Sequence, residues 1–130
     1  MKRLGFVREM EPRRGLDLPP VAALAGRLEP KDIPWVLAYL EHGTDVFDVM
    51  EATRDPEEPG GRLIPGGSSL VTDGEWVWRK DLPNFIRAHR IVLPEEFLSQ
   101  ARVACDTGDF PRVVVDDALV RSVLAAAGWV

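Results

Sequence analysis

The stretch 73–97, DGEWVWRKDLPNFIRAHRIVLPEEF, holds the densest local structural information in this 130-residue chain. Its first residues predict a β-hairpin over residues 69–78, because Asp-Gly is a preferred two-residue turn between β-rich arms. A turn at this dipeptide would pair Val71 with Trp76. Alternation along the strands then places Val71, Trp76 and Trp78 on one face, and we expect both tryptophans to lie in the core.

Helical patterns surround this hairpin. The helix predicted at residues 82–90 begins behind Asp81, an expected N-cap, and Pro94 opens the next helix, at residues 94–104. Further helical patterns lie at residues 20–28, 32–42 and 117–127, and a β-rich run lies at residues 45–50. The sequence therefore predicts an α+β fold. We expect a small, mainly antiparallel sheet built on hairpin 69–78, with strand 45–50 beside it and four to five short helices covering it.

A single domain is expected over residues 1–130. Residues 1–19 are polar and contain two prolines and four arginines, so we expect a short strand or a loosely docked arm with poorly ordered first residues. Residues 51–67, EATRDPEEPGGRLIPGG, show neither helical nor strand periodicity. Loops of this length are usually functional or mobile, and we expect a long mobile loop here.

The charge pattern argues against nucleic acid as a partner. The net charge is −5, and residues 45–66 alone hold six acidic and two basic residues. No segment is a basic block that could neutralise a phosphate backbone. No apolar run approaches the length of a membrane span, and the single cysteine, Cys105, excludes an internal disulfide. We therefore expect a cytoplasmic protein without a membrane partner.

The sequence contains no recognisable catalytic or metal-binding motif. The two histidines, His42 and His89, and Cys105 lack the spacing of metal ligands. Asp106 beside Cys105 opposes formation of a thiolate, so we interpret the cysteine as structural. We predict no catalytic residue, no metal and no cofactor, and the sequence favours a protein that is not an enzyme.

Basic residues concentrate locally only after the hairpin. Together with the neighbouring tryptophan, they give six candidate binding residues: Trp76, Arg79, Lys80, Arg87, His89 and Arg90. Arg87 and Arg90 are three residues apart on a predicted helix and share a face, which could bind an acidic partner or a phosphate. The alternative is a solvated surface whose charges are balanced by nearby carboxylates.

Two short signatures carry a resemblance to other proteins. D-G-x-W-x-W-x-x-D-L begins at Asp73, and L-P-x-x-F-L begins at Leu93. On these residues the chain resembles a group of small actinobacterial proteins for which no activity is established. The resemblance implies a shared hairpin–helix–helix unit. The size, acidity and source of these proteins suggest an accessory or immunity role in a bacterial toxin system.

Three functions follow, in descending order of support. The first is a non-enzymatic protein-binding or accessory module whose loop 51–67 binds a basic partner. The second is a small enzyme or small-molecule binder with a pocket near Trp76, Arg79, His89 and this loop. It requires a concave pocket that holds His89 with a carboxylate within hydrogen-bond reach. The third is nucleic-acid binding through the basic cluster. The sequence leaves the oligomeric state open.

Overall fold

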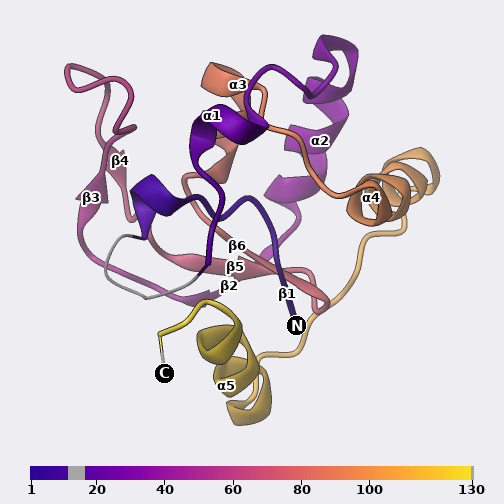
Figure 1. Ribbon diagram of the computed structural model, residues 1–130. Coiled ribbons are helices and arrows are strands. Elements are labelled where there is room, and N and C mark those ends of the chain that lie inside the picture. The colour runs from indigo at the N-terminus through magenta and orange to yellow at the C-terminus, as the bar shows by residue number, and fades with distance from the viewer. Residues whose placement is uncertain (12–16, 130) are drawn as a thin grey trace.

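The computed structural model describes residues 1–11 and 17–129 and confirms the α+β fold (Figure 1). The main sheet has the strand order β1-β6-β5-β2. Its strands are β1 (Lys2–Arg3), β2 (Thr44–Phe47), β5 (Leu70–Thr72) and β6 (Trp76–Arg79). β5 is antiparallel to β2 and β6, as expected of a hairpin with strand 45–50 beside it. β1 pairs with β6 in parallel.

Helices cover both faces of this sheet (Figure 1). The α-helices are α1 (Val21–Leu24), α2 (Ile33–Glu41), α3 (Leu82–His89), α4 (Glu95–Thr107) and α5 (Asp117–Ala126). Two 3-10 turns, η1 (Arg8–Met10) and η2 (Pro30–Asp32), precede α1 and α2. α1 to α4 lie on one side of the sheet and α5 lies on the other. No helix within the described ranges is long and apolar enough to cross a membrane.

The register of the hairpin differs from the predicted one. Val71 lies opposite Trp78, and not Trp76, so the tip of the turn moves one residue along the chain. The cause is hydrogen bonding by Asp73, whose Oδ1 accepts from the backbone N–H of Glu75 at 2.9 Å and of Trp76 at 2.7 Å. Side-chain bonds of this kind stabilise an alternative to the bare two-residue turn.

The new register preserves the predicted division of the hairpin into two faces. Trp76 and Trp78 are 4% and 1% exposed and pack in the larger core, beneath α1 to α4. The expectation that both tryptophans are core residues is confirmed. Leu70 and Val77 point to the opposite face, where they form a smaller core with Val123 of α5.

Gly43, which lies between α2 and β2, does not have a positive φ. A Cβ atom at Gly43 would instead lie 2.4 Å from Cζ2 of Trp78 and 2.5 Å from Cγ1 of Val71. The glycine is therefore required because β2 starts directly against the side chains of β5 and β6.

The N-terminal residues are part of the core and do not form a loose arm. Leu4, Phe6 and Val7 are all buried. The backbone N–H of Leu4 donates to the carbonyl of Val77 at 2.8 Å, which extends the pairing of β1. Only two residues form β1, too few for a recognisable alternating pattern. The remainder of the predicted arm includes residues 12–16, which lie outside the described ranges.

The segment 51–67, expected to be irregular, contains a second sheet. Its strands are β3 (Ala52–Thr53) and β4 (Ile64–Pro65), which pair antiparallel. We call this hairpin with its connecting loop the ribbon; it stands beside the main sheet (Figure 1). The β-rich run at residues 45–50 forms a strand only as far as Phe47, which is partly exposed, and Met50 beyond it is 97% exposed.

Candidate functional site

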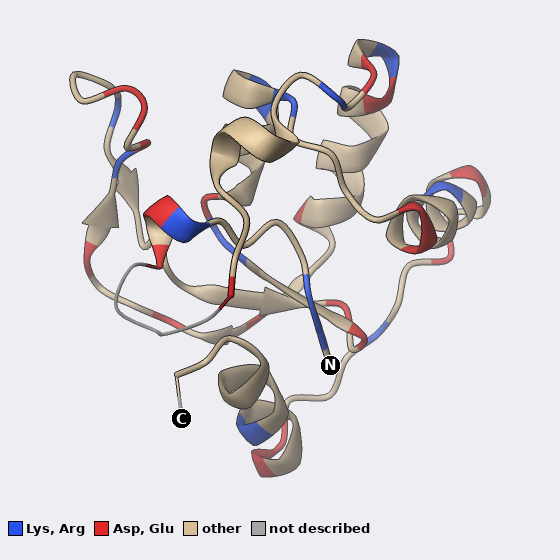
Figure 2. Cartoon of the chain, viewed as in Figure 1, with Lys and Arg blue, Asp and Glu red and all other residues tan. Residues whose placement is uncertain are grey.

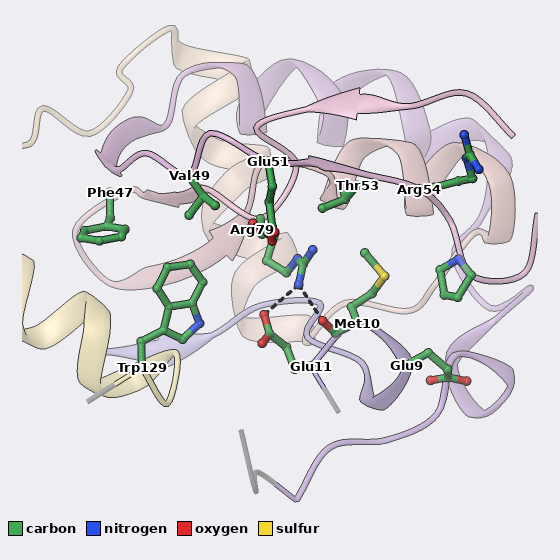
Figure 3. Close-up of a pocket in the computed structure, with 12 residues that line it drawn as sticks. Glu9, Met10, Glu11, Phe47, Val49, Glu51, Thr53, Arg54, Arg79 and Trp129 are labelled. Atoms are coloured by element: carbon green, nitrogen blue, oxygen red, sulfur yellow. Dashed lines mark hydrogen bonds and ion pairs between the residues drawn. The ribbon is translucent and has the colours of Figure 1, made fainter. Parts of the chain in front are cut away.

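A pocket of about 720 Å³ opens between the ribbon, η1 and the C-terminal tryptophan (Figure 3). We call it the ribbon pocket. Its lining comprises Glu9, Met10, Glu11, Phe47, Val49, Glu51, Thr53, Arg54, Pro56, Ser68, Arg79 and Trp129. Its volume lies within the range of pockets that bind small molecules or single side chains of a partner.

Arg79 occupies the floor of the ribbon pocket. Its Nε and Nη2 donate to the two carboxylate oxygens of Asp81 at 3.0 and 2.8 Å. Its Nη1 donates to Glu11 Oε1 at 2.8 Å and to the Met10 carbonyl at 2.9 Å (Figure 3). All three charged side chains are buried. Burial lowers the pKa of the guanidinium, but the hydrogen bonds and charges of Asp81 and Glu11 outweigh it and raise the pKa of Arg79.

Asp81 connects this cluster to two further elements. It stands at the N-cap of α3, as predicted, but its carboxylate makes no capping bond. It binds Arg79 instead, and it accepts a hydrogen bond from Thr53 Oγ1 of β3 at 2.9 Å. The floor of the pocket therefore joins η1, the ribbon and the start of α3 through buried polar contacts.

One wall of the pocket is apolar. The rings of Phe47 and Trp129 meet edge to face, with centroids 5.6 Å apart, and Val49 lies next to them (Figure 3). Trp129 folds back onto the body, since its backbone N–H donates to the Leu124 carbonyl at 2.9 Å. Gly128 permits this reversal with a φ of 76°.

The remaining wall is polar and mainly acidic. Three glutamates, Glu9, Glu11 and Glu51, line the pocket with two arginines, Arg54 and Arg79. Glu9 accepts from the backbone N–H of Val21 at 3.1 Å, which fixes η1 against the start of α1. Figure 2 shows acidic residues on η1 and at the base of the ribbon. The pocket thus combines an aromatic wall with a net acidic one.

A smaller pocket of about 260 Å³ lies between the ribbon and α3, and we call it the helix pocket. Close to it, His89 Nε2 lies 2.6 Å from Oδ2 of Asp55, with both side chains largely buried. Asp55 lines the helix pocket, and its Oδ1 also accepts from the backbone N–H of Glu57 at 2.9 Å. The requirement set for a small-molecule site was a pocket that holds His89 with a carboxylate within hydrogen-bond reach. The carboxylate is present, whereas the lining of the helix pocket includes Asp55 but not His89.

The six predicted binding residues do not come together in one site. Arg79 lines the ribbon pocket and Arg87 the helix pocket, while Trp76 is buried on the opposite face of β6. Lys80 pairs with Asp45 on the surface at 3.4 Å. Arg90 ends α3 with a φ of 48°, and its guanidinium donates to the carbonyls of residues 26 and 28.

Sequence reasoning missed Glu11, Phe47 and Trp129 as pocket residues. Glu11 and Trp129 lie far from the ribbon in sequence, and Phe47 is one of several apolar residues of its strand. No local sequence pattern therefore indicated that they would line a pocket. Among the described residues, no group of three His, Cys, Asp or Glu side chains is arranged to hold a metal ion.

Comparisons with known proteins found no matching family model, no matching curated protein and no matching solved structure.

Proposed function

We propose that this protein is a non-enzymatic binding module that attaches to a basic segment of a partner protein through the ribbon pocket. The observation that carries this proposal is the pocket of about 720 Å³ in which an aromatic pair, Phe47 and Trp129, faces three glutamates. A pocket of this composition suits a segment that presents both an apolar and a cationic side chain.

Exposed apolar side chains near the pocket support a protein as the ligand. Met50, between the lining residues Val49 and Glu51, is 97% exposed, and Leu63 of the ribbon is also exposed. Protein interfaces are typically formed by an apolar centre with a polar surround. Exposed apolar residues beside a pocket therefore extend the surface available to a partner.

The charge of this region favours a basic partner. Residues 45–66 hold six acidic and two basic residues, which gives this segment a net charge of 2 − 6 = −4. The net charge of the whole chain is −5, so most of it lies in this segment. Opposite charge speeds association and selects against acidic partners. An accessory protein that neutralises a basic toxin, in the manner of an immunity protein, is one role with this requirement.

Site-specific photo-crosslinking in the native host tests the proposal. A benzophenone amino acid is placed at Met50, beside the ribbon pocket, or at Val114, an exposed control residue between α4 and α5. We expect the Met50 variant to crosslink a basic protein that the Val114 variant does not. Identical products at both positions, or none at Met50, would overturn the proposal.

A charge-reversal pair then tests the acidic wall with the captured partner. Glu51→Lys changes a residue that lines the ribbon pocket. The control, Glu95→Lys, makes the same change at an exposed position of α4. Glu51→Lys should weaken binding, more strongly at low salt, because salt screens exposed charges. Equal affinities for the two variants would show that the partner binds elsewhere.

Small-molecule binding beside α3 is the second candidate function. It is favoured by the contact between His89 and Asp55 at 2.6 Å next to the helix pocket. A buried histidine–carboxylate pair at the edge of a cavity is a common feature of binding sites.

A further inference from the structure

Two arginines line the helix pocket. Arg62 comes from the ribbon and Arg87 from α3, so the two guanidiniums belong to different walls. Within the described ranges, neither side chain lies within ion-pair distance of a carboxylate. Arg87 Nη1 donates to Oδ1 of Asn84 at 3.2 Å, which directs this guanidinium along the surface of α3. Two unpaired guanidiniums at one cavity are suited to a carboxylate or another oxyanion.

The same pocket also presents negative charge. Glu58 and Asp55 line it, and Asp55 is held against His89. A bare phosphate would be attracted by the arginines but repelled by these carboxylates. A ligand that carries an ammonium group as well as a carboxylate would meet favourable charges at both ends.

The size and the apolar surface of the pocket limit the ligand further. A volume of about 260 Å³ corresponds to roughly nine water molecules at about 30 Å³ each. Ile64 and Ala88 supply an apolar patch between the charged groups. This leaves room for a small side chain next to the charged ends of a ligand.

We propose that the helix pocket binds a small zwitterion of the α-amino-acid class, with its carboxylate on Arg62 and Arg87 and its ammonium group on Glu58 and Asp55. This inference rests on the second candidate function, small-molecule binding beside α3, and names the ligand class. It is independent of the protein partner proposed for the ribbon pocket.

Nuclear magnetic resonance titration of the ¹⁵N-labelled full chain tests the ligand class. The probes are alanine and leucine as zwitterions, propionate as a carboxylate alone, propylamine as an ammonium alone, and inorganic phosphate. We expect alanine or leucine to shift the backbone amides of Gly61, Arg62 and Ala88, with a dissociation constant on the order of 1 mM. Propionate, propylamine and phosphate should each bind at least about tenfold more weakly, because they lose one set of charged contacts.

Variants then locate the site. Arg62→Gln and Arg87→Gln should each weaken binding of the zwitterion by at least about tenfold, since a charged hydrogen bond is lost. Arg62→Lys keeps the charge without the planar fork and should give an intermediate loss. Arg121→Gln removes an exposed arginine of α5, on the other side of the sheet, and should leave affinity unchanged.

The outcomes distinguish failure of the proposed ligand class from failure of the small-molecule site itself. Phosphate or propionate binding as tightly as alanine would overturn the zwitterion but would leave a small-molecule site. No shift with any probe would overturn both the ligand class and the second candidate function. Zwitterion binding that is unaffected by Arg62→Gln and Arg87→Gln would place the ligand elsewhere and overturn the inference.

Discussion

Asp81 is the residue that joins the most segments at the ribbon pocket. It is almost fully buried and accepts hydrogen bonds from Arg79 and Thr53. Asp81→Ala would leave the guanidinium buried with one carboxylate fewer, so we expect the free energy of unfolding to fall by about 3–5 kcal/mol. Denaturant titration measures this loss.

Asp45→Ala is the matched control for this prediction. Asp45 forms an ion pair with Lys80 in which both side chains are about half exposed. Exposed pairs contribute little, so this variant should cost at most about 1 kcal/mol. If the two variants lose similar stability, the buried contacts of Asp81 with Arg79 and Thr53 do not stabilise the fold as their hydrogen bonds indicate.

Tyr39, the single tyrosine of the chain, provides a spectroscopic test of a second buried contact. Its hydroxyl donates to Oδ2 of Asp73 at 2.7 Å. Burial, followed by the hydrogen bond and charge of Asp73, raises the pKa of the phenol above its ordinary value of 10.0. The neutral phenol is thus favoured in the folded state. The stability that this raised pKa contributes is complete below pH 10. It is lost as the pH rises through the pKa of Tyr39 in the folded protein.

We therefore expect no tyrosinate absorbance from the folded protein near pH 10, measured by ultraviolet titration. Asp73→Asn removes the charge but keeps a hydrogen-bond acceptor, and it should lower the pKa of Tyr39. That pKa should still exceed the ordinary value, because burial remains the largest cause. Tyrosinate that forms in the folded wild-type protein with a normal midpoint would contradict this account.

At the scale of elements, β1 contributes more stability than its two residues suggest. It pairs with β6, and Leu4 directly after it is completely buried in the larger core. Leu4→Ala leaves a cavity there, so we expect a loss of about 2–5 kcal/mol in the free energy of unfolding. Denaturant titration with Met50→Ala as the exposed control, expected to change stability by no more than about 0.5 kcal/mol, checks the prediction. If Leu4→Ala lost no more stability than Met50→Ala, β1 and the residue after it would contribute little to the free energy of unfolding.

Much of the element structure could be predicted because its signals are local. The hairpin and four of the helices follow from turn residues, apolar periodicity and prolines within short windows. The helix at 20–28 was overestimated, since the chain leaves α1 at Ala25 in an extended conformation. The parallel pairing of β1 could not be predicted, because its partner strand lies in a distant part of the sequence.

At the scale of the whole molecule, the sheet separates two cores of unequal size. The larger core lies beneath α1 to α4, and the smaller one lies against α5 (Figure 1). In the smaller core, Val123 of α5 and Ala127 after it are fully buried against Leu70 and Val77 of the sheet. Because less apolar area holds α5, we expect its amides to exchange through a smaller opening free energy than those of β6 and α4. Native-state hydrogen exchange measures both. Equal opening energies would mean that the two cores unfold as one unit.

The candidate site was less predictable than the fold, because it forms only when distant segments meet. Arg79 and residues of loop 51–67 line the same pocket, and both are conspicuous in the sequence. Trp76 lies apart from Arg79, in the core, because side chains alternate between the two faces along β6. Asp55 gave no sign of its contact with His89, which depends on how the ribbon folds back onto α3.

The pairing of β1 has a consequence for synthesis of the chain. The backbone N–H of Lys2 bonds to the carbonyl of Glu75, and these residues are 73 positions apart. Ribosomes add about 5–20 residues per second, so the N-terminal segment must wait for roughly 4–15 s before its partner strand exists. During that interval Leu4, Phe6 and Val7 have no sheet to cover them. We therefore expect these apolar residues to be accessible to chaperones on the nascent chain until β6 has emerged.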